Sequence, residues 1–320
     1  MDHERQAGNE FDFIDWIRRL LPDPDGDVPM GPGDDCAVVA VGEERLLLKV
    51  DSILEGVHMQ FAQPDAPGFA TPRQAGYKSV ARALSDVAAM GGVPRFALAN
   101  TTLPHGRGRA FREELLFGML DACALFSVRL VGGDTKTWTE HSALALGITL
   151  MGDMQSVAPV YRSGGKPGDC LLVTGTLGGS LQGKHLNFTP RCAEGRWLAE
   201  FGVRCMIDLS DGISGDLRHI CGGSHCGAII DEASLPVSDD AELCSRNSGQ
   251  TPHTHALHDG EDYELLFSVA QERTGALMAK WPFADTKLTS IGFLVEGREV
   301  TLRNAAGVRP MPNRGYEHEF

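Results

Sequence analysis

Positive charge is scarce in this 320-residue sequence. There are 29 Lys and Arg against 43 Asp and Glu, which gives a formal net charge of −14. Nucleic acids and anionic membranes are bound by clustered positive side chains, and the sequence has no basic run that could form such a cluster. The charge balance therefore argues against both classes of partner. It also raises the question of what would hold a ligand that is itself anionic.

Paired cysteines and long apolar runs are also missing. The eight Cys are scattered along the chain without a CxxC pair or a zinc-type spacing. No stretch approaches the roughly 18–20 consecutive apolar residues that span a bilayer. The polar N-terminal segment MDHERQAGNE lacks the apolar core of a signal peptide. Together these absences predict a reduced, cytoplasmic protein of enzyme size.

What is present is enough apolar sequence for two domains. A chain of 320 residues with 42% hydrophobic content exceeds what one core usually organises. The composition turns polar and Gly-rich around residues 152–169, so we expect one domain over residues 1–152 and a second over 153–320. Strand-like and helix-like segments mix in both halves without a strict βαβ rhythm. That mixture favours α+β domains over a doubly wound sheet.

Apolar periodicity and turn residues place the expected elements. Helices are predicted over residues 11–21, 73–90, 110–126 and 192–201, with another after Asp211. Strands are predicted over residues 36–41, 45–50, 96–103, 128–131, 143–151, 170–174, 206–209, 264–269 and 288–293.

Several acidic residues stand beside these apolar runs. They are Asp34 and Asp35 in a Gly-Pro-Gly loop, Asp51 after LLLKV, Asp134 after VRLVGG, and Asp208 and Asp211 around DLSDG. An acid at the end of a packed strand is carried to the sheet edge and held there. Two such charges ~6 Å apart repel by about 3 kcal/mol at an effective dielectric near 20, so converging acids need protons or a bound cation.

The acids and their glycine neighbours predict a nucleotide held through metal ions. Oxygen ligands supplied singly from separate loops suit Mg²⁺, which takes its remaining ligands from water and phosphate oxygens. Glycines at positions 31, 33, 132, 133 and 212 let the backbone approach a ligand closely. Any one of these motifs alone would be a turn. The prediction depends on their number and their repeated position.

Three other motifs could indicate different chemistry. GGSLQGKH at residues 178–185 nearly spells a P-loop, but it ends in His where Ser or Thr would ligate Mg²⁺. DLSDG at residues 208–212 holds a Ser beside acids but forms no GxSxG elbow. His253, His255 and His258 lie in what we interpret as a polar loop, which favours solvated side chains over a transition-metal site.

Taken in order, the motifs resemble those of the thiamine-monophosphate kinase family, whose superfamily includes aminoimidazole ribonucleotide synthetase. The matching segments are GDDCA (33–37), VDSILEGVH (50–58), ALSDVAAMG (83–91), LVGGDT (130–135), RSGGKPGD (162–169), IDLSDG (207–212) and GEDYEL (260–265). The resemblance spans about residues 10–318 in the family's order and approximate spacing. The motifs are specific as a set, although no single one is.

The resemblance implies a fold, an activity and partners. It implies the two-domain α+β fold of the superfamily, in a homodimer whose N-terminal sheets pair into a barrel with the nucleotide near that interface. It also implies direct phosphoryl transfer from ATP to thiamine monophosphate, giving thiamine diphosphate with the help of several Mg²⁺ ions. Such a transfer depends on positioning and charge neutralisation, so we expect no protein nucleophile or general base.

The resemblance further implies roles for individual residues. The implied metal ligands are Asp35, Asp51, Asp86, Asp134, Asp208 and Asp211, with Asp34 beside Asp35 as a further candidate. The implied nucleotide contacts are Gly133, Asp134, Arg162, Ser210 and Phe126, of which Arg162 would stabilise the phosphates. The implied contacts to thiamine monophosphate are His58, Glu261 and Tyr316.

The chain departs from the family pattern, and two other functions stay open. Many family members carry Ser-Thr before the Asp at 51, where this chain has Lys49 and Val50, so two hydroxyl ligands are missing. Phe126 stands where a Tyr is common. One alternative is another ATP-dependent reaction on a phosphorylated small molecule, such as aminoimidazole ribonucleotide synthesis. The other is a nucleotide-binding regulator without turnover.

Overall fold

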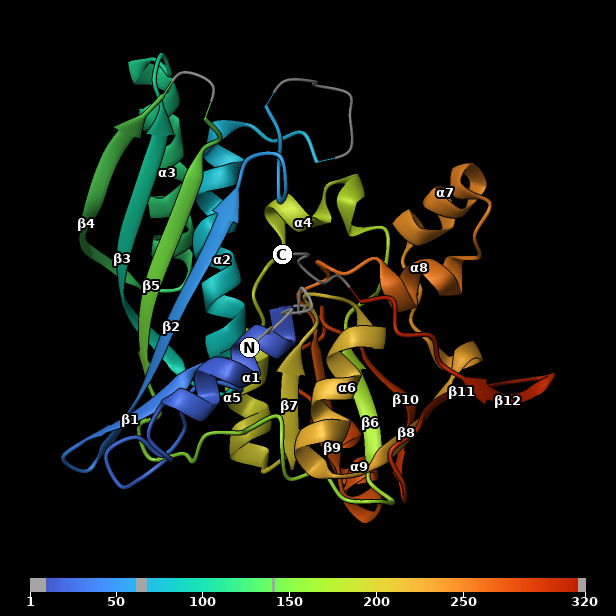
Figure 1. Cartoon of the computed structure of the whole chain (residues 1–320). Helices are drawn as coiled ribbons and strands as arrows, with labels where there is room; N and C mark the ends of the chain where they lie inside the picture. The colour runs from blue at the N-terminus through green and yellow to red at the C-terminus, as the bar shows by residue number, and fades with distance from the viewer. Residues whose placement is uncertain (1–9, 62–67, 140–141, 316–320) are drawn as a thin grey trace, which may run out of the picture.

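The first half of the chain folds into one sheet with two long helices against one of its faces (Figure 1). The computed structural model describes residues 10–61, 68–139 and 142–315. The elements of this half are α1 (Glu10–Leu20), β1 (Ala37–Val41), β2 (Glu44–Leu54), α2 (Pro72–Ala89), β3 (Val93–Pro104), α3 (Arg109–Leu125), β4 (Arg129–Trp138) and β5 (Ala145–Asp153). The strand order is β1-β2-β5-β3-β4. The β3–β4 pair is parallel, and the other pairs are antiparallel.

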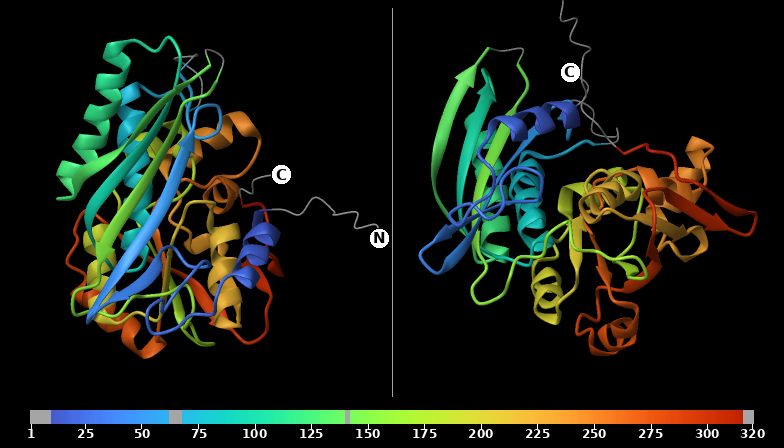
Figure 2. Two further views of the ribbon diagram at one scale, coloured as in Figure 1. Left: turned by 60° about the vertical axis from the view of Figure 1, so that its left-hand side comes forward. Right: turned by 60° about the horizontal axis from the view of Figure 1, so that its bottom comes forward.

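Strand β2 shows how the sequence gives this sheet two different faces. Its side chains alternate between the face under α2 and the opposite face, as the period of a strand requires. Leu47 and Ile53 are buried on the helix-covered face, and Lys49 and Asp51 lie in register between them. Leu48, Val50 and Leu54 are exposed on the other face, which the described helices leave uncovered (Figure 2).

Helix α2 occupies the centre of the molecule. It begins at a capping box, in which Thr71 and Gln74 satisfy each other's backbone N–H groups, and Pro72 follows the cap. The helix packs against β2 and β5, against α3, and against α5 and β7 of the second half. A Cβ at Gly76 would lie 2.0 Å from the Leu115 carbonyl oxygen, so glycine sets the close approach of α2 to α3. A helix buried on nearly every side can carry polar groups into the interior.

The second half of the chain builds a larger, mixed sheet. Its elements are β6 (Cys170–Thr174), η1 (Ser180–Gln182), α4 (Lys184–Asn187), α5 (Cys192–Phe201), β7 (Cys205–Asp208), α6 (Ile213–Ser224), β8 (Gly227–Asp231), η2 (Glu232–Ser234), α7 (Asp239–Ser248), α8 (Pro252–His258), β9 (Leu265–Val269), α9 (Gln271–Lys280), β10 (Leu288–Val295), β11 (Val300–Asn304) and β12 (Gly307–Pro310). The strand order is β12-β11-β8-β10-β6-β9-β7. Apolar side chains of β6, β7 and β9 pack alternately on α6 and α8 on one face and on α5 and α9 on the other. Strand β7 is therefore a buried edge strand that ends at Asp208.

The α+β architecture confirms the predicted fold class, and three local predictions were wrong. Strand β4 continues to Trp138, so Asp134 lies within a strand and does not follow one. Strand β2 likewise continues past Asp51 to Leu54. The histidine segment is helix α8, whose His255 is buried and bonded to Asp259 and Ser248. Within the described residues, none of the helices is both long and apolar enough to cross a membrane.

Candidate active site

A cleft of about 680 Å³ lies between the two halves of the chain. Its walls come from β2, α2 and the loop before β1 on one side, and from the loop after β7 and helix α6 on the other. Ile14 and Arg18 of α1 also line it. The cleft therefore brings together motifs that are up to about two hundred residues apart in the sequence, which is the arrangement expected of a ligand site between domains.

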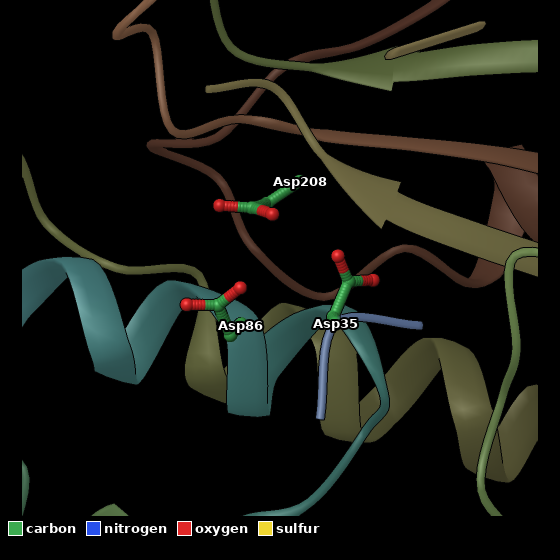
Figure 3. Close-up of side chains that lie close together, drawn as sticks. All are labelled: Asp35, Asp86 and Asp208. Atoms are coloured by element: carbon green, nitrogen blue, oxygen red, sulfur yellow. The ribbon is translucent and has the colours of Figure 1, made fainter. Parts of the chain in front are cut away.

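Three buried carboxylates converge beside this cleft (Figure 3). Asp35 comes from the loop before β1, Asp86 from α2 and Asp208 from the end of β7. One oxygen of each lies within 4.8 Å of the other two. Their side chains point toward one another from three different elements (Figure 3). The acids predicted from scattered motifs thus form one cluster, which we call the acid cluster.

The acid cluster is under electrostatic strain. Burial raises the pKa of Asp86 well above its usual range, with Lys49 opposing this effect and Asp208 adding to it. Burial and the nearby charge of Asp35 raise the pKa of Asp208 to about 6. The hydroxyl of Ser85 donates to Asp208 at 2.6 Å and favours its ionised form. A carboxylate cluster of this kind is relieved by a bound cation.

The acid cluster fits a magnesium ion. Its donors are carboxylate oxygens, the type that Mg²⁺ prefers. Among the described residues none donates a hydrogen bond to Oδ2 of Asp35, although that atom is buried. A buried acceptor without a donor is costly in a folded protein. Asp35, Asp86 and Asp208 therefore supply the oxygen ligands that a hard cation needs, and Oδ2 of Asp35 is available to bind it.

Two basic side chains balance part of the charge of the acid cluster. Arg162 donates to Asp35 at 2.5 Å, and Lys49 donates to Asp86 at 2.7 Å. Arg162 also lines the cleft. The backbone N–H of Arg162 donates to Asp34 at 3.1 Å. Burial and the neighbouring Asp35 raise the pKa of Asp34 to about 7.

Asp51 lines the cleft but is already paired with the guanidinium of Arg82. Its Oδ2 lies 3.0 Å from Nε of Arg82. Burial alone would raise the pKa of Asp51, but Arg82 and Lys49 outweigh it, so this pKa is lowered and the carboxyl is ionised. Asp51 can join a metal site only in competition with Arg82. The sequence motifs did not indicate this partner.

Two predicted residues, Ser210 and Asp211, line the cleft on the loop after β7. The carbonyl of Ser210 accepts the N–H of Glu261 at 2.7 Å, which joins the IDLSDG and GEDYEL motifs. Asp216 of α6 was missed; it is buried, lines the cleft and accepts the N–H of Asp211 at 3.1 Å. Its position in the first turn of a helix that follows an acidic loop could have indicated it. Burial and Asp211 raise the pKa of Asp216 well above its usual range.

Two predicted substrate residues, His58 and Glu261, are linked by a lysine beside the cleft. Lys78 of α2 is fully buried and donates to Glu261 at 2.7 Å and to the His58 carbonyl at 2.8 Å. The ring Nδ1 of His58 accepts the N–H of Leu54 at 3.1 Å. Burial and the charge on Arg82 lower the pKa of His58 to about 4, so its ring is neutral near pH 7. Lys78 was missed, because a lysine on a helix face is ordinarily solvated.

Three predicted nucleotide contacts lie apart from this cleft. In the sheet register Ser52 pairs with Gly147, Gly147 with Asn100, and Asn100 with Asp134. Three strand spacings of about 4.8 Å separate Asp134 from Ser52 by roughly 14 Å. Ser52 and Asp134 thus belong to one set of paired residues across the sheet, and this set lies on the uncovered face. Asp51 and Gly133 belong to the adjacent set, which lies on the face under the helices.

The surroundings of these residues differ from those of the cleft. Asp134 is exposed and pairs with Lys136 at 2.6 Å. Gly133 lines a second cavity, of about 310 Å³, between β4 and α3. Phe126 follows the end of α3 and packs against the core of the first half. Tyr316 lies outside the described residues. Asp134 therefore lies apart from the other predicted metal ligands, which line or adjoin the cleft.

Comparison with known proteins identifies the family. The model described as AIR synthase related protein, N-terminal domain, matches residues 33–154, and its C-terminal domain matches residues 180–303. The thiamine-monophosphate kinase of Rhodopirellula baltica is 36% identical over 280 residues, covering 84% of each chain. That of Escherichia coli K12 is 33% identical over 308 residues, covering 86% of this chain and 90% of the relative.

Solved structures agree with these relatives. The structure of AaThiL complexed with AMPPCP and TMP matches with a TM-score of 0.82 and 27% identity, covering 97% of each chain. The thiamine-monophosphate kinase of Stenotrophomonas maltophilia K279a matches with a TM-score of 0.72 and 30% identity, over 92% of this chain and 96% of that one. With both domain models matched and relatives above 30% identity over most of its length, the chain belongs to the thiamine-monophosphate kinase family of AIR synthase-related proteins.

Proposed function

We propose that the chain transfers the γ-phosphoryl group of ATP to the phosphate of thiamine monophosphate, giving ADP and thiamine diphosphate. The observation that carries the proposal is the acid cluster, which suits a magnesium-bound nucleotide. The choice of acceptor is supported by the relatives, whose names specify thiamine monophosphate and which align with 84–86% of this chain. The neighbouring structure contains both TMP and the ATP analogue AMPPCP.

The chemistry needs positioned charge and no protein base. An oxygen of the acceptor phosphate bonds to the γ-phosphorus of ATP while the bond from that phosphorus to the bridging oxygen breaks, and ADP leaves. The attacking oxygen is already ionised, so no side chain has to take a proton. Bound Mg²⁺ supplies positive charge to the phosphate oxygens. Asp35, Asp86 and Asp208 would hold it, and Arg162 adds a fixed cation at the cleft wall.

We assign the acceptor to the part of the cleft that His58 lines, next to Glu261, which Lys78 links to the His58 carbonyl. The neutral ring of His58 can hydrogen-bond a substrate without adding charge. Glu261 is held by Lys78 and has a backbone φ of 53°, so its side chain is fixed by its pairing and by a strained backbone. A fixed carboxylate suits a cationic or amino-bearing ring. Tyr316 remains a predicted contact to that ring.

We further propose that the protein is a homodimer that pairs the uncovered faces of two N-terminal sheets. That face carries exposed apolar side chains on two strands that flank β5, namely Leu48 and Val50 of β2 and Phe96 and Leu98 of β3. An apolar face of this kind on a sheet favours burial against another sheet. The proposal gives Asp134, on the uncovered face, a place beside the interface, while Gly133 and Phe126 stay predicted contacts to the nucleotide.

We also propose that the chain divides into two domains near residues 152 and 153, because each half forms its own sheet. The first sheet ends with β5 at Asp153, and the second begins with β6 at Cys170. The cytoplasmic location remains a prediction from the sequence.

The direct test is ADP formation from ATP and Mg²⁺ with thiamine monophosphate, with thiamine as the control acceptor. We expect the monophosphate to stimulate ADP release and thiamine to leave it at the background rate. No stimulation by the monophosphate would contradict the proposed activity. ATP binding without ADP release with any phosphorylated acceptor would instead favour the regulator, and release with another phosphorylated acceptor would favour a different reaction of the superfamily.

A further inference from the structure

Lys49 points from strand β2 into the acid cluster. It lies on the helix-covered face of β2, in register with buried Leu47 and Ile53. Its Nζ donates to Oδ1 of Asp86 at 2.7 Å, and its side chain is 23% exposed. A lysine ammonium on the covered face of a sheet is costly to desolvate unless it has a charged partner. Its partner here is one of the three acids that suit Mg²⁺.

The fixed cations around the acid cluster offset most of its charge. Arg162 pairs with Asp35 and Lys49 pairs with Asp86, while Asp208 accepts the hydroxyl of Ser85 and has no ion pair with any residue that the structure describes. Three carboxylates thus have two cations built into the chain. Each divalent ion that enters must share Asp86 with an ammonium already bonded to it. Because like charges a few ångströms apart repel strongly in a buried site, the ammonium excludes a second cation from its own position.

The backbone leaves Lys49 little room to withdraw. Its Cβ emerges on the face under α2, and the alternation of β2 prevents it from reaching the uncovered face, where Leu48 and Val50 point. The ammonium can move only along the cleft wall, which is lined by the carboxylates Asp51, Asp86 and Asp208. Wherever it settles along this wall, its charge remains within the site.

We propose that Lys49 acts as a built-in cation that takes the place of one divalent ion beside Asp86. The inference rests on the proposed use of magnesium-bound nucleotide in this cleft. It makes Lys49 a positioning residue, because it acts on the phosphates through Asp86 and the remaining metal. The open oxygen of Asp35 and the carboxylate of Asp208 are left for the ions that do bind. A cleft with serine in this position would accept one more divalent ion.

The test counts bound metal in the full-length protein. Equilibrium dialysis against Mn²⁺ in the presence of AMPPCP, followed by metal analysis, gives the number of ions per chain. We expect Lys49→Ser to bind about one Mn²⁺ more than the wild type, because a divalent ion replaces the ammonium. Lys49→Arg, which retains the charge, should bind the wild-type number. Lys280→Ser, at the exposed end of α9, is the matched control and should also bind the wild-type number.

Each outcome decides for or against the inference. Equal counts for wild type and Lys49→Ser, both folded by circular dichroism in the dialysis buffer, would overturn it, as would an extra ion in Lys49→Arg. Should the serine variant not fold, Lys49→Ala provides the same comparison. The measurement needs no turnover and no thiamine monophosphate. If the wild type is an active kinase and Lys49→Ser binds no additional Mn²⁺, only the role of Lys49 is refuted. If Lys49→Ser binds an additional Mn²⁺ and the wild type has no kinase activity, the role of Lys49 is supported and the proposed reaction is refuted.

Discussion

At the scale of single residues, Asp208 is a buried carboxyl whose ionisation lowers the stability of the folded protein. Its pKa of about 6 in the folded protein exceeds the value near 3.9 of an unfolded chain. The folded state therefore binds the proton more tightly, and stability without metal falls as pH rises from about 4 to 6. The shift of about two units corresponds to about 3 kcal/mol, as an order of magnitude.

Replacing Asp208 by Asn should therefore separate stability from activity. In EDTA at pH 8 we expect Asp208→Asn to be more stable than the wild type by up to about 3 kcal/mol, a difference that shrinks toward pH 4. With Mg²⁺ its kinase activity should fall about 100-fold or more, since even outer-shell partners of a metal contribute about 10- to 100-fold. Urea unfolding across pH and ADP release measure the two effects.

The control for this prediction has the opposite sign. The hydrogen bond and charge of Arg303 lower the pKa of Asp231, so Asp231→Asn should reduce stability at pH 8 and leave kinase activity unchanged. A variant Asp208→Asn that is less stable than the wild type at pH 8 would show that the cluster is not strained in the absence of metal.

The sequence predicted most of the acidic residues that line the cleft but not how they are paired. The number and repeated position of the acids beside apolar runs indicated Asp35 and Asp208, and the resemblance to the family added Asp86. Buried pairing depends on tertiary contact, so the link between Lys78 and Glu261, 183 residues apart, has no local pattern. The cation on Asp51, Arg82, was missed for the same reason.

At the scale of elements, helix α2 supplies Arg82 and Asp86 to the wall of the cleft, and Lys78 of the same helix holds Glu261 beside it. Its position depends on the close contact with α3. We expect Gly76→Ala to reduce the free energy of unfolding by about 1–3 kcal/mol or more, since the new Cβ meets the Leu115 carbonyl. Kinase activity should fall with it as the helix shifts. Thermal and urea unfolding, with ADP release, measure the result.

The same substitution in another helix is the control. Gly275 of α9 has nothing within 4 Å of the position of a Cβ, so Gly275→Ala should stabilise by up to about 1 kcal/mol through helix propensity. Equal effects of the two substitutions would mean that the approach of α2 to α3 is not limiting.

Strand lengths explain where the sequence-based view of the site failed. We expected acids at the ends of strands, and Asp208 does end β7. Asp51 and Asp134 lie inside β2 and β4, so alternation and strand order decide their direction. One side chain faces the cleft and the other lies on the uncovered face at the sheet edge. A sequence indicates a strand more readily than its last residue, its neighbours or its two faces.

At the scale of the whole molecule, the proposed dimer depends on the uncovered face of the first sheet. We expect the wild type to sediment as a dimer and Val50→Asp to sediment as a monomer, since Val50 is 69% exposed on that face. Val308→Asp on β12, where the valine is 60% exposed, should remain a dimer. Analytical ultracentrifugation at several concentrations measures this. A dimer that survives Val50→Asp would place the interface elsewhere.

The net charge of −14 constrains how the molecule can use two anionic substrates. Seven of the acids line or adjoin one cleft, namely Asp34, Asp35, Asp51, Asp86, Asp208, Asp211 and Asp216. Lys49, Arg82 and Arg162 offset part of that charge, and each is already bonded to an acid. A triphosphate entering without metal would meet more negative than positive charge, so the cation has to arrive with it.

Removal of Mg²⁺ should therefore abolish nucleotide binding and not merely slow turnover. Titration calorimetry with AMPPCP should give a measurable affinity in Mg²⁺ and a loss of about 100-fold or more in EDTA, equal to about 3 kcal/mol, the size of one buried charge pair at an effective dielectric near 20. Restoring Mg²⁺ to the same sample should restore binding, which excludes unfolding as the cause. Tight binding of AMPPCP in EDTA would mean that the arginines alone hold the phosphates, and that the acid cluster has another purpose.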